Sequence, residues 1–429
     1  PDMSLVPASV LKTITTATAL EVLGGGYTFK TELQYSGSID TNCVLHGDIY
    51  IKGGGDPALG SRYFTDHYFE PYFMDIWADA IVQLGIDSID GRVIGDDMLF
   101  GLEPTPSTWT YGDLGNYFGA SPSALSIYDN ACYLTFSTSA TAGDSAVLQC
   151  IDPFIPEMDM LNFVKGANVY DDNSTITGAM FDDQRMITGT LPKSKDEYEV
   201  RGSLPDPARQ AAFELTMALQ RRNIVLKNNY TTTRQIYLDR QTIEKERTGF
   251  FTTTSPSVTS IVYWTNLVSV NLFAEHLLYG IGLVRVGSAT AGSGTGAVTS
   301  YWAKKGINTK GLYMMDGSGL SRYNAVSARH LTDIFKYMAI TSKYAKTFEG
   351  SLPVAGKSGT LSKMCKKTTA EGRVMAKSGT IQRVKSFAGY VKTTSGKKLA
   401  FALLINNFNC SNSEVVKKIE KVFVAMSVY

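Results

Sequence analysis

The spacing of apolar residues along the chain predicts a protein that contains both helices and strands. Apolar positions three or four residues apart predict helices at residues 9–22, 77–84, 206–222, 257–268, 272–282, 327–339 and 413–426. Alternating or β-branched runs bounded by turn residues predict strands at residues 28–33, 44–52, 92–94, 133–137, 231–238, 386–393 and 398–406. The last two strands flank a Ser-Gly turn, which predicts a hairpin. We therefore expect a mixed α/β (α+β) protein with helices around an antiparallel sheet.

The length and composition predict several folded domains. With 429 residues, the chain is too long for one ordinary hydrophobic core and suggests two or three domains. Hydrophobic residues make up 44% of the chain and charged residues 19%, a balance typical of folded proteins. Residues 104–190 are rich in Pro, Gly, Ser, Thr and Asp, which predicts a small separate unit. No apolar run approaches the roughly 18 residues needed to cross a bilayer.

The near-zero net charge conceals two opposed blocks. A formal charge of +1 removes the overall basic footprint of most nucleic-acid-binding proteins, so no nucleic-acid partner is expected. Residues 40–103 contain twelve acidic and three basic residues, whereas residues 357–398 contain eleven basic residues and one acidic residue. Two interpretations stay open: both blocks are solvated faces, or the basic block lies near a site for an anionic ligand.

The cysteines and histidines carry no ligand pattern. Five cysteines are widely spread without a C-x-x-C pair, and four histidines lack the H-E-x-x-H spacing. We therefore predict no metal site and no cofactor, while disulfide pairing stays open.

Lys12 is the first candidate for chemistry. It is the only charged residue between Ser4 and Glu21, on a helix that otherwise reads as buried, and an unpaired buried ammonium is costly. Ser9 lies three residues earlier, so its Oγ shares a helix face with the amine. This spacing suits a serine nucleophile with a lysine base, although an N-cap serine with an outward-reaching lysine is the alternative.

Two further segments carry polar groups at suggestive spacings. Ser269 and Asn271 can face one cleft only if a loop breaks the helix between Val268 and Leu272. Lys377, Ser378, Gly379 and Thr380 precede the hairpin, so an ammonium, hydroxyls and bare backbone can meet a carboxylate-bearing ligand.

A near copy of the second segment, at residues 357–360, follows a turn and precedes no hairpin, so we favour the later lysine. The same copy lacks the glycine spacing of a nucleotide-binding P-loop.

In this order, S-x-x-K, S-x-N and K-[ST]-G resemble the motif set of the active-site serine penicillin-binding proteins and β-lactamases. The chain is most similar to the class C low-molecular-mass penicillin-binding proteins, a family of D-alanyl-D-alanine carboxypeptidases and endopeptidases. The resemblance covers essentially the whole chain and includes the segments at residues 7–12, 53–59, 316–322 and 352–356. Val270 stands where the family usually has Asp, and Ser378 where Thr is commoner.

The resemblance implies a transpeptidase-like domain split by two nested, β-rich inserts. The expected segments are residues 1–31 and 246–429 for the catalytic domain, 32–104 and 189–245 for the first insert, and 105–188 for the nested insert. Only eight residues precede Ser9, where the family has secondary structure, so we expect a chain trimmed at its N-terminus. The family also implies export to the periplasm or cell envelope, with the signal peptide absent from this chain.

The resemblance further implies a role for each residue. Ser9 is the expected nucleophile, Lys12 its base, Ser269 the proton relay and Asn271 the group that holds the substrate amide. Lys377 is expected to supply positive charge, and the segment Ser378, Gly379 and Thr380 to bind the substrate's terminal carboxylate. Three residues resemble family positions that line a pocket for the diamino acid side chain: Asp129, Arg322 and Gln382.

The implied function is hydrolysis of the terminal D-Ala-D-Ala bond and of D-Ala cross-links in peptidoglycan, with β-lactams as covalent inhibitors of Ser9. Two alternatives remain: a slow-turnover penicillin-binding sensor, and a β-lactamase-like hydrolase. The 256 residues between Lys12 and Ser269 argue against the compact β-lactamase.

Overall fold

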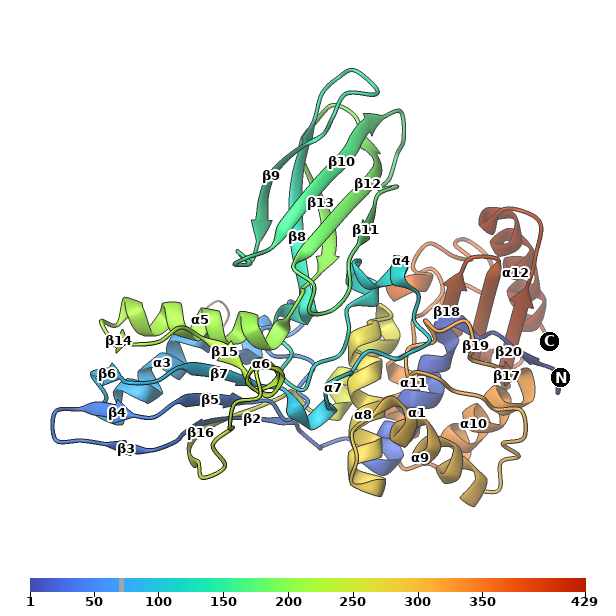
Figure 1. Cartoon of the computed structure of the whole chain (residues 1–429). Helices are drawn as coiled ribbons and strands as arrows, with labels where there is room; N and C mark the ends of the chain where they lie inside the picture. The colour runs from blue at the N-terminus through green and yellow to red at the C-terminus, as the bar shows by residue number, and fades with distance from the viewer. Residues whose placement is uncertain (69–72) are drawn as a thin grey trace. The chain divides into compact units, whose positions relative to one another are not determined.

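The computed structural model describes residues 1–68 and 73–429, which form two compact units (Figure 1). The first unit comprises Pro1–Tyr27, Pro106–Thr108 and Ser257–Tyr429, and the second comprises Thr28–Thr105 and Trp109–Pro256. The predicted three-domain boundaries stay a prediction. Within the described residues, we find no helix with the length and apolar character of a membrane span.

The first unit is built from a three-stranded antiparallel sheet and helices. Its sheet has the order β18 (Val374–Ile381), β19 (Val384–Lys392) and β20 (Lys398–Asn406). Its main helical elements are η1 (Ala8–Leu11), α1 (Lys12–Val22), α7 (Val258–Leu267), α8 (Asn271–Val286), α9 (Ala291–Lys304), α10 (Ala328–Ile340), α11 (Ala345–Gly350) and α12 (Asn412–Ser427). A short pair, β1 (Ser4–Leu5) with β17 (Val326–Ser327), and the turn η5 (Gly359–Leu361) complete it.

The position of each helix in this unit follows from its residues. Residues 12–20 of α1 are all buried, so this helix lies in the core, as its apolar sequence predicts. Helix α12 buries one stripe and packs Phe423 edge-on against Phe387 and Phe401 of the sheet. Ser411 caps this helix through the backbone N–H of Glu414, which fixes where α12 begins.

The second unit contains several sheets. The larger two are β15-β7-β5-β2-β16 and β14-β6-β4-β3, built from β2 (Lys30–Tyr35), β3 (Ser38–Ile39), β4 (Val44–His46), β5 (Ile49–Lys52), β6 (Ser88–Ile89), β7 (Val93–Asp96), β14 (Val225–Leu226), β15 (Thr231–Thr232) and β16 (Thr248–Thr254). Two three-stranded sheets, β13-β8-β9 and β10-β12-β11, contain β8 (Ala131–Thr138), β9 (Val147–Asp152), β10 (Asp159–Ala167), β11 (Thr175–Thr177), β12 (Gln184–Pro192) and β13 (Lys195–Ser203).

The helices of the second unit include α2 (Thr65–Tyr68), α3 (Phe73–Val82), α4 (Tyr111–Leu114), α5 (Pro207–Arg221) and α6 (Thr233–Leu238), with the turns η2 (Met98–Phe100), η3 (Tyr117–Gly119) and η4 (Tyr128–Asn130). Helices α3, α5 and α6 pack against the larger sheets of this unit, whereas α4 contacts β11. Asp206 caps α5 by accepting the backbone N–H of Arg209, and Pro207 occupies the first turn, so the predicted start of this helix is confirmed.

Some predicted elements differ from the structure. The predicted strand at residues 231–238 is wrong: only Thr231–Thr232 is extended, and α6 follows, because the Thr232 hydroxyl accepts the backbone N–H of Gln235 and caps a helix. The predicted strand at residues 44–52 is two strands of different sheets. Helix α9 was not predicted, because its Gly- and Ser-rich sequence favours a loop, and strand β16 was also missed.

Candidate active site

Ser9 and Lys12 lie at the junction of η1 and α1 in the first unit. Ser9 belongs to the 3₁₀ turn, in which side chains three residues apart are nearly eclipsed, so Lys12 is placed beside it. The Nζ of Lys12 lies 3.0 Å from the Oγ of Ser9. The predicted pairing of hydroxyl and amine is therefore present, and the alternative of an outward-reaching lysine is wrong because Lys12 is fully buried.

The surroundings of Lys12 combine burial, which opposes its charged form, with acceptors and carboxylates that favour it. Its Nζ donates to the Oδ1 of Asn271 at 2.5 Å and to the carbonyl of Ser318 at 2.7 Å. Burial lowers the pKa of Lys12 to about 7, against the opposing charges of Asp316 and Glu275. A neutral amine donates two hydrogen bonds and has one lone pair, so these two acceptors leave the lone pair for the Ser9 hydroxyl.

Ser269 and Asn271 lie where the chain turns from α7 into α8. Helix α7 ends at Leu267 and α8 begins at Asn271, so the predicted break between the two helices is confirmed. Ser269 has a φ of 69°, an uncommon value for a residue other than glycine. This conformation lets its hydroxyl and the Asn271 amide serve one site although they are two residues apart.

Lys377 approaches from strand β18. It is fully buried, and its Nζ donates to the Oγ of Ser269 and to the carbonyl of Ser378, both at 2.8 Å. Burial lowers the pKa of Lys377 well below its usual value, and the positive charges of Lys12 and Lys385 lower it further. Lys377 thus contacts Ser269, and Lys12 contacts Asn271 of the same segment.

Gly379 allows β18 to lie against η1. A Cβ at this position would lie 2.7 Å from the carbonyl oxygen of Pro7 and 2.9 Å from the backbone N of Ser9. Real Cβ atoms essentially never come so close to backbone, so any other residue would force the strand away from Ser9. The glycine of the third motif is therefore required by packing.

The hydroxyls of Ser378 and Thr380 each have one neighbour. Ser378 donates to the Oγ1 of Thr360 at 2.9 Å, and the Nζ of Lys385 donates to the Oγ1 of Thr380 at 2.6 Å. Thr360 comes from the near copy of the motif, which sequence reasoning set aside. Lys357 of that copy is exposed and pairs with Glu371 at 3.0 Å. The preference for Lys377 over Lys357 therefore agrees with the geometry.

Comparison with known proteins identifies the family. The model of the D-Ala-D-Ala carboxypeptidase 3 (S13) family matches residues 1–427. The chain belongs to this family. It is an enzyme of the S13 peptidases, and the family resemblance predicted from the three motifs is confirmed.

Relatives and solved structures agree with this assignment. A D-alanyl-D-alanine carboxypeptidase of Actinomadura sp. (strain R39) is 29% identical over 419 residues, 94% of this chain and 73% of that protein. The D-alanyl-D-alanine carboxypeptidase DacB of Haemophilus influenzae is 24% identical over 420 residues, 96% and 82% of the two chains. The crystal structure of penicillin-binding protein 4 from the same organism shares the fold, with a TM-score of 0.83, 22% identity and coverage of 100% and 92%.

Glu275 is a buried residue of this S13 enzyme that sequence reasoning missed. Its carboxylate accepts the backbone N–H groups of Gly317 at 2.9 Å and Ser318 at 2.8 Å. Burial and the nearby charge of Asp316 raise the pKa of Glu275 to about 8. Because the carbonyl of Ser318 accepts from Lys12, Glu275 fixes a loop that holds Lys12. The sequence signal was a lone acid within an otherwise apolar helical run.

The predicted diamino acid pocket stays a prediction. Asp129 belongs to the second unit, has a φ of 58°, and accepts the backbone N–H of Arg62 at 3.3 Å. Burial raises the pKa of Asp129 to about 6. Arg322 and Gln382 are exposed residues of the first unit. Asp129 therefore belongs to a different unit from Arg322 and Gln382.

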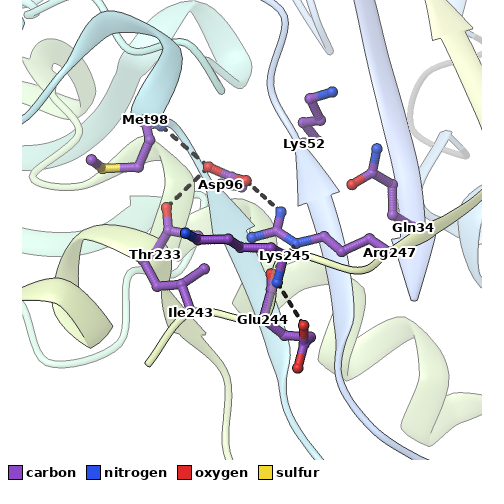
Figure 2. A pocket seen from close by; sticks show the side chains of 9 residues that line it. All are labelled: Gln34, Lys52, Asp96, Met98, Thr233, Ile243, Glu244, Lys245 and Arg247. Atoms are coloured by element: carbon purple, nitrogen blue, oxygen red, sulfur yellow. Dashed lines mark hydrogen bonds and ion pairs between the residues drawn. The ribbon is translucent and has the colours of Figure 1, made fainter. Parts of the chain in front are cut away.

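The second unit also contains a pocket of about 480 Å³ on the sheet formed by β2, β5 and β7 (Figure 2). None of its lining residues was predicted as functional. Two of its basic residues are paired: Arg247 bonds Asp96 at 2.6 Å, and Lys52 lies 3.4 Å from Glu32 on the neighbouring strand β2. These ion pairs give Arg247 and Lys52 a structural role, and we do not assign the pocket to the S13 chemistry.

Proposed function

We propose that this enzyme is a serine D,D-peptidase that hydrolyses the terminal D-Ala-D-Ala bond of peptidoglycan stem peptides through an acyl-enzyme on Ser9. The observation that supports it best is the buried Lys12 amine, 3.0 Å from the Ser9 hydroxyl and with its pKa lowered to about 7. At neutral pH, a base with a pKa near 7 is partly in its unprotonated form and still has a useful affinity for a proton.

In the first step, the Ser9 Oγ attacks the carbonyl carbon of the penultimate D-Ala, and its proton passes to the Nζ of Lys12. The backbone N–H groups of Ser9 and Thr380 are the proposed donors to the resulting oxyanion. Such preorganised donors are worth about 2.7–4 kcal/mol each in comparable sites. Asn271 holds the substrate amide and one N–H of Lys12.

In the second step, the peptide C–N bond breaks and the terminal D-Ala leaves as an amine. The proton on Lys12 passes through the Ser269 hydroxyl to the departing amine. The Nζ of Lys377 orients this hydroxyl by donating to its Oγ at 2.8 Å. Water then attacks the ester, again with Lys12 as base, and restores Ser9. A β-lactam would follow the first step, but its ring-opened amine stays attached and its acyl-enzyme hydrolyses slowly.

The third motif binds the substrate's terminal carboxylate through the Ser378 and Thr380 hydroxyls and the charge of Lys377. Within the first unit, we also propose that Arg322 and Gln382 contact the diamino acid side chain, since a guanidinium matches its carboxylate. On this basis, the enzyme also cleaves D-Ala cross-links as an endopeptidase. Its place of action is the cell envelope outside the cytoplasm.

Covalent labelling tests the nucleophile. A fluorescent penicillin should label the wild type, whereas Ser9→Ala should remain unlabelled because no hydroxyl can form the ester. Ser395→Ala is the matched control, since Ser395 begins the other S-x-x-K spacing but lies exposed in the β19–β20 turn. Equal labelling of the Ser9→Ala variant and the wild type would contradict the proposal.

Product analysis tests the reaction. The wild type should release D-Ala from a pentapeptide and cleave cross-linked dimers in purified sacculi, both measured by mass spectrometry. Labelling without any D-Ala release would instead identify a slow-turnover sensor. Rapid hydrolysis of nitrocefin without action on peptides would identify a β-lactamase-like hydrolase.

A further inference from the structure

Lys385 lies beside the hydroxyl that is proposed to bind the substrate carboxylate. Strands β18 and β19 pair antiparallel, and their register places Thr380 directly opposite Lys385. Directly opposed residues project from the same face of a sheet. The Nζ of Lys385 uses this proximity to donate to the Oγ1 of Thr380 at 2.6 Å.

This contact determines what the Thr380 hydroxyl can do. An ammonium has no lone pair, so Thr380 is the acceptor and its own O–H proton remains available to a ligand. The ammonium of Lys385 has three N–H groups and also lies 5.6 Å from the ring centroid of Phe387. Among the described residues, no carboxylate pairs with it, whereas Lys392 on the same strand pairs with Glu349 at 3.3 Å.

Lys377 and Lys385, on adjacent strands, differ in their contacts. Lys377 is fully buried and donates to Ser269 and to its own strand, so it serves the proton relay. Lys385 is half-buried on the neighbouring strand and can reach a ligand from solvent. Burial lowers the pKa of Lys385, but the environment is more exposed than that of Lys377.

We propose that Lys385 is a second cation for the terminal carboxylate of the substrate, which it binds together with the hydroxyl of Thr380. This inference rests on the proposed function, because it names the group that recognises the acid end of the D-Ala-D-Ala substrate. The three S-x-x-K, S-x-N and K-[ST]-G motifs do not include this residue. A charge-assisted hydrogen bond is stronger than a neutral one. The lysine should therefore increase the preference of the enzyme for substrates with a free terminal carboxylate.

The test compares an acid with its amide. Lys385→Met keeps much of the aliphatic stem and removes the charge; it should raise KM about tenfold for a peptide ending in D-Ala-D-Ala, with kcat within about twofold. The corresponding C-terminal carboxamide should show little change, and Lys385→Arg should restore most of the loss. Lys397→Met is the matched control, because Lys397 lies exposed in the hairpin turn and changes the net charge equally.

An unchanged KM for the acid, or equal losses for the acid and the amide, would overturn the inference. Thermal unfolding midpoints close to the wild type would show that the variants are folded. If no D-Ala is released by the wild type, the proposed peptidase function fails, but the inference is still tested by acylation. Lys385→Met should then slow acylation of Ser9 by benzylpenicillin about tenfold, and it should not change the acylation rate with the methyl ester of benzylpenicillin. Equal rates of the variant and the wild type with benzylpenicillin would overturn the inference.

Discussion

At the scale of single residues, the site depends on the hydrogen-bond partners and charges around each buried amine. Lys12 and Lys377 have the same side chain and are both fully buried, but their partners differ. Lys12 has three hydrogen-bond partners and the charges of Asp316 and Glu275 nearby, whereas Lys377 has two further ammonium groups nearby. Burial lowers the pKa of Lys12 to about 7 although these carboxylates oppose the shift, and its contact with Ser9 supports the proposed role of base.

The pH dependence of acylation should report the titration of Lys12. Burial lowers its pKa to about 7, and only the neutral form can accept the Ser9 proton. Acylation by a fluorescent penicillin should therefore rise with pH up to about 7 and then level off, falling about tenfold per pH unit below it. A rate that is flat between pH 5 and pH 8 would contradict this assignment.

Asn271→Asp provides a second arm of the same experiment. The new carboxylate would lie beside the Lys12 ammonium, in place of an oxygen now 2.5 Å away, and should raise the pKa of Lys12 by about 1–3 units. The midpoint of the acylation profile should move to higher pH by that amount, whatever the loss in maximal rate. Ser395→Ala should keep the wild-type midpoint.

At the scale of secondary structure elements, the site requires close approach of a strand and a turn. Strand β18 lies against η1 because Gly379 has no side chain, and Ser386 of the adjacent strand donates to the carbonyl of Pro7. Ser9 and the third motif are thereby held together by the close approach of backbone at Gly379 and by the Ser386 hydrogen bond. Side-chain chemistry alone would not fix their separation.

Gly379→Ala should separate these elements. The added Cβ would lie within 3 Å of backbone atoms of Pro7 and Ser9, so β18 must shift. We expect acylation to slow by more than about a hundredfold, because misplaced reacting groups react much more slowly. Gly296→Ala is the control, since a Cβ there meets nothing within 4 Å and the site is helical. Stopped-flow labelling measures both. If the Gly379→Ala variant is acylated at the wild-type rate, the close packing of β18 against η1 is not required for the site.

At the scale of the whole molecule, the first unit is assembled from distant parts of the chain. The backbone N–H of Val258 donates to the carbonyl of Tyr27 at 2.9 Å, so the chain leaves and re-enters this unit at adjacent points. Such insertions are tolerated because the scaffold's own chain ends meet. The 229 residues from 28 to 256 contain all of the second unit and the short segment Pro106–Thr108.

Replacing residues 28–256 by a short Gly-Ser linker should leave a folded unit that a penicillin still labels. The two ends are already joined by hydrogen bonds, so a short linker spans them. Cooperative thermal unfolding and fluorescent labelling measure the outcome, with the same deletion carrying Ser9→Ala as the control. An aggregated product, or a folded one that is not labelled, would show that the second unit is needed for the site.

The sequence by itself determined the three motifs and most of the elements that carry them. Ser9 and Lys12 are three residues apart, and their shared face is a local property of helical geometry. The hairpin at the end of the sheet was also predicted from the sequence, because the alternation of apolar residues and the turn residues are local signals that span only a few positions. Residues 231–238 were misread because one threonine cap outweighed β-branched composition.

Only the tertiary structure decided which of these groups meet and in what protonation state. Asn271 and Ser318 reach Lys12 across 259 and 306 residues of sequence, and Lys377 reaches Ser269 across 108. Glu275 and Lys385 join the site through such packing and carry no motif. Spacing along the chain shows which side chains can share a local face, but desolvation and charge at an amine depend on everything folded around it.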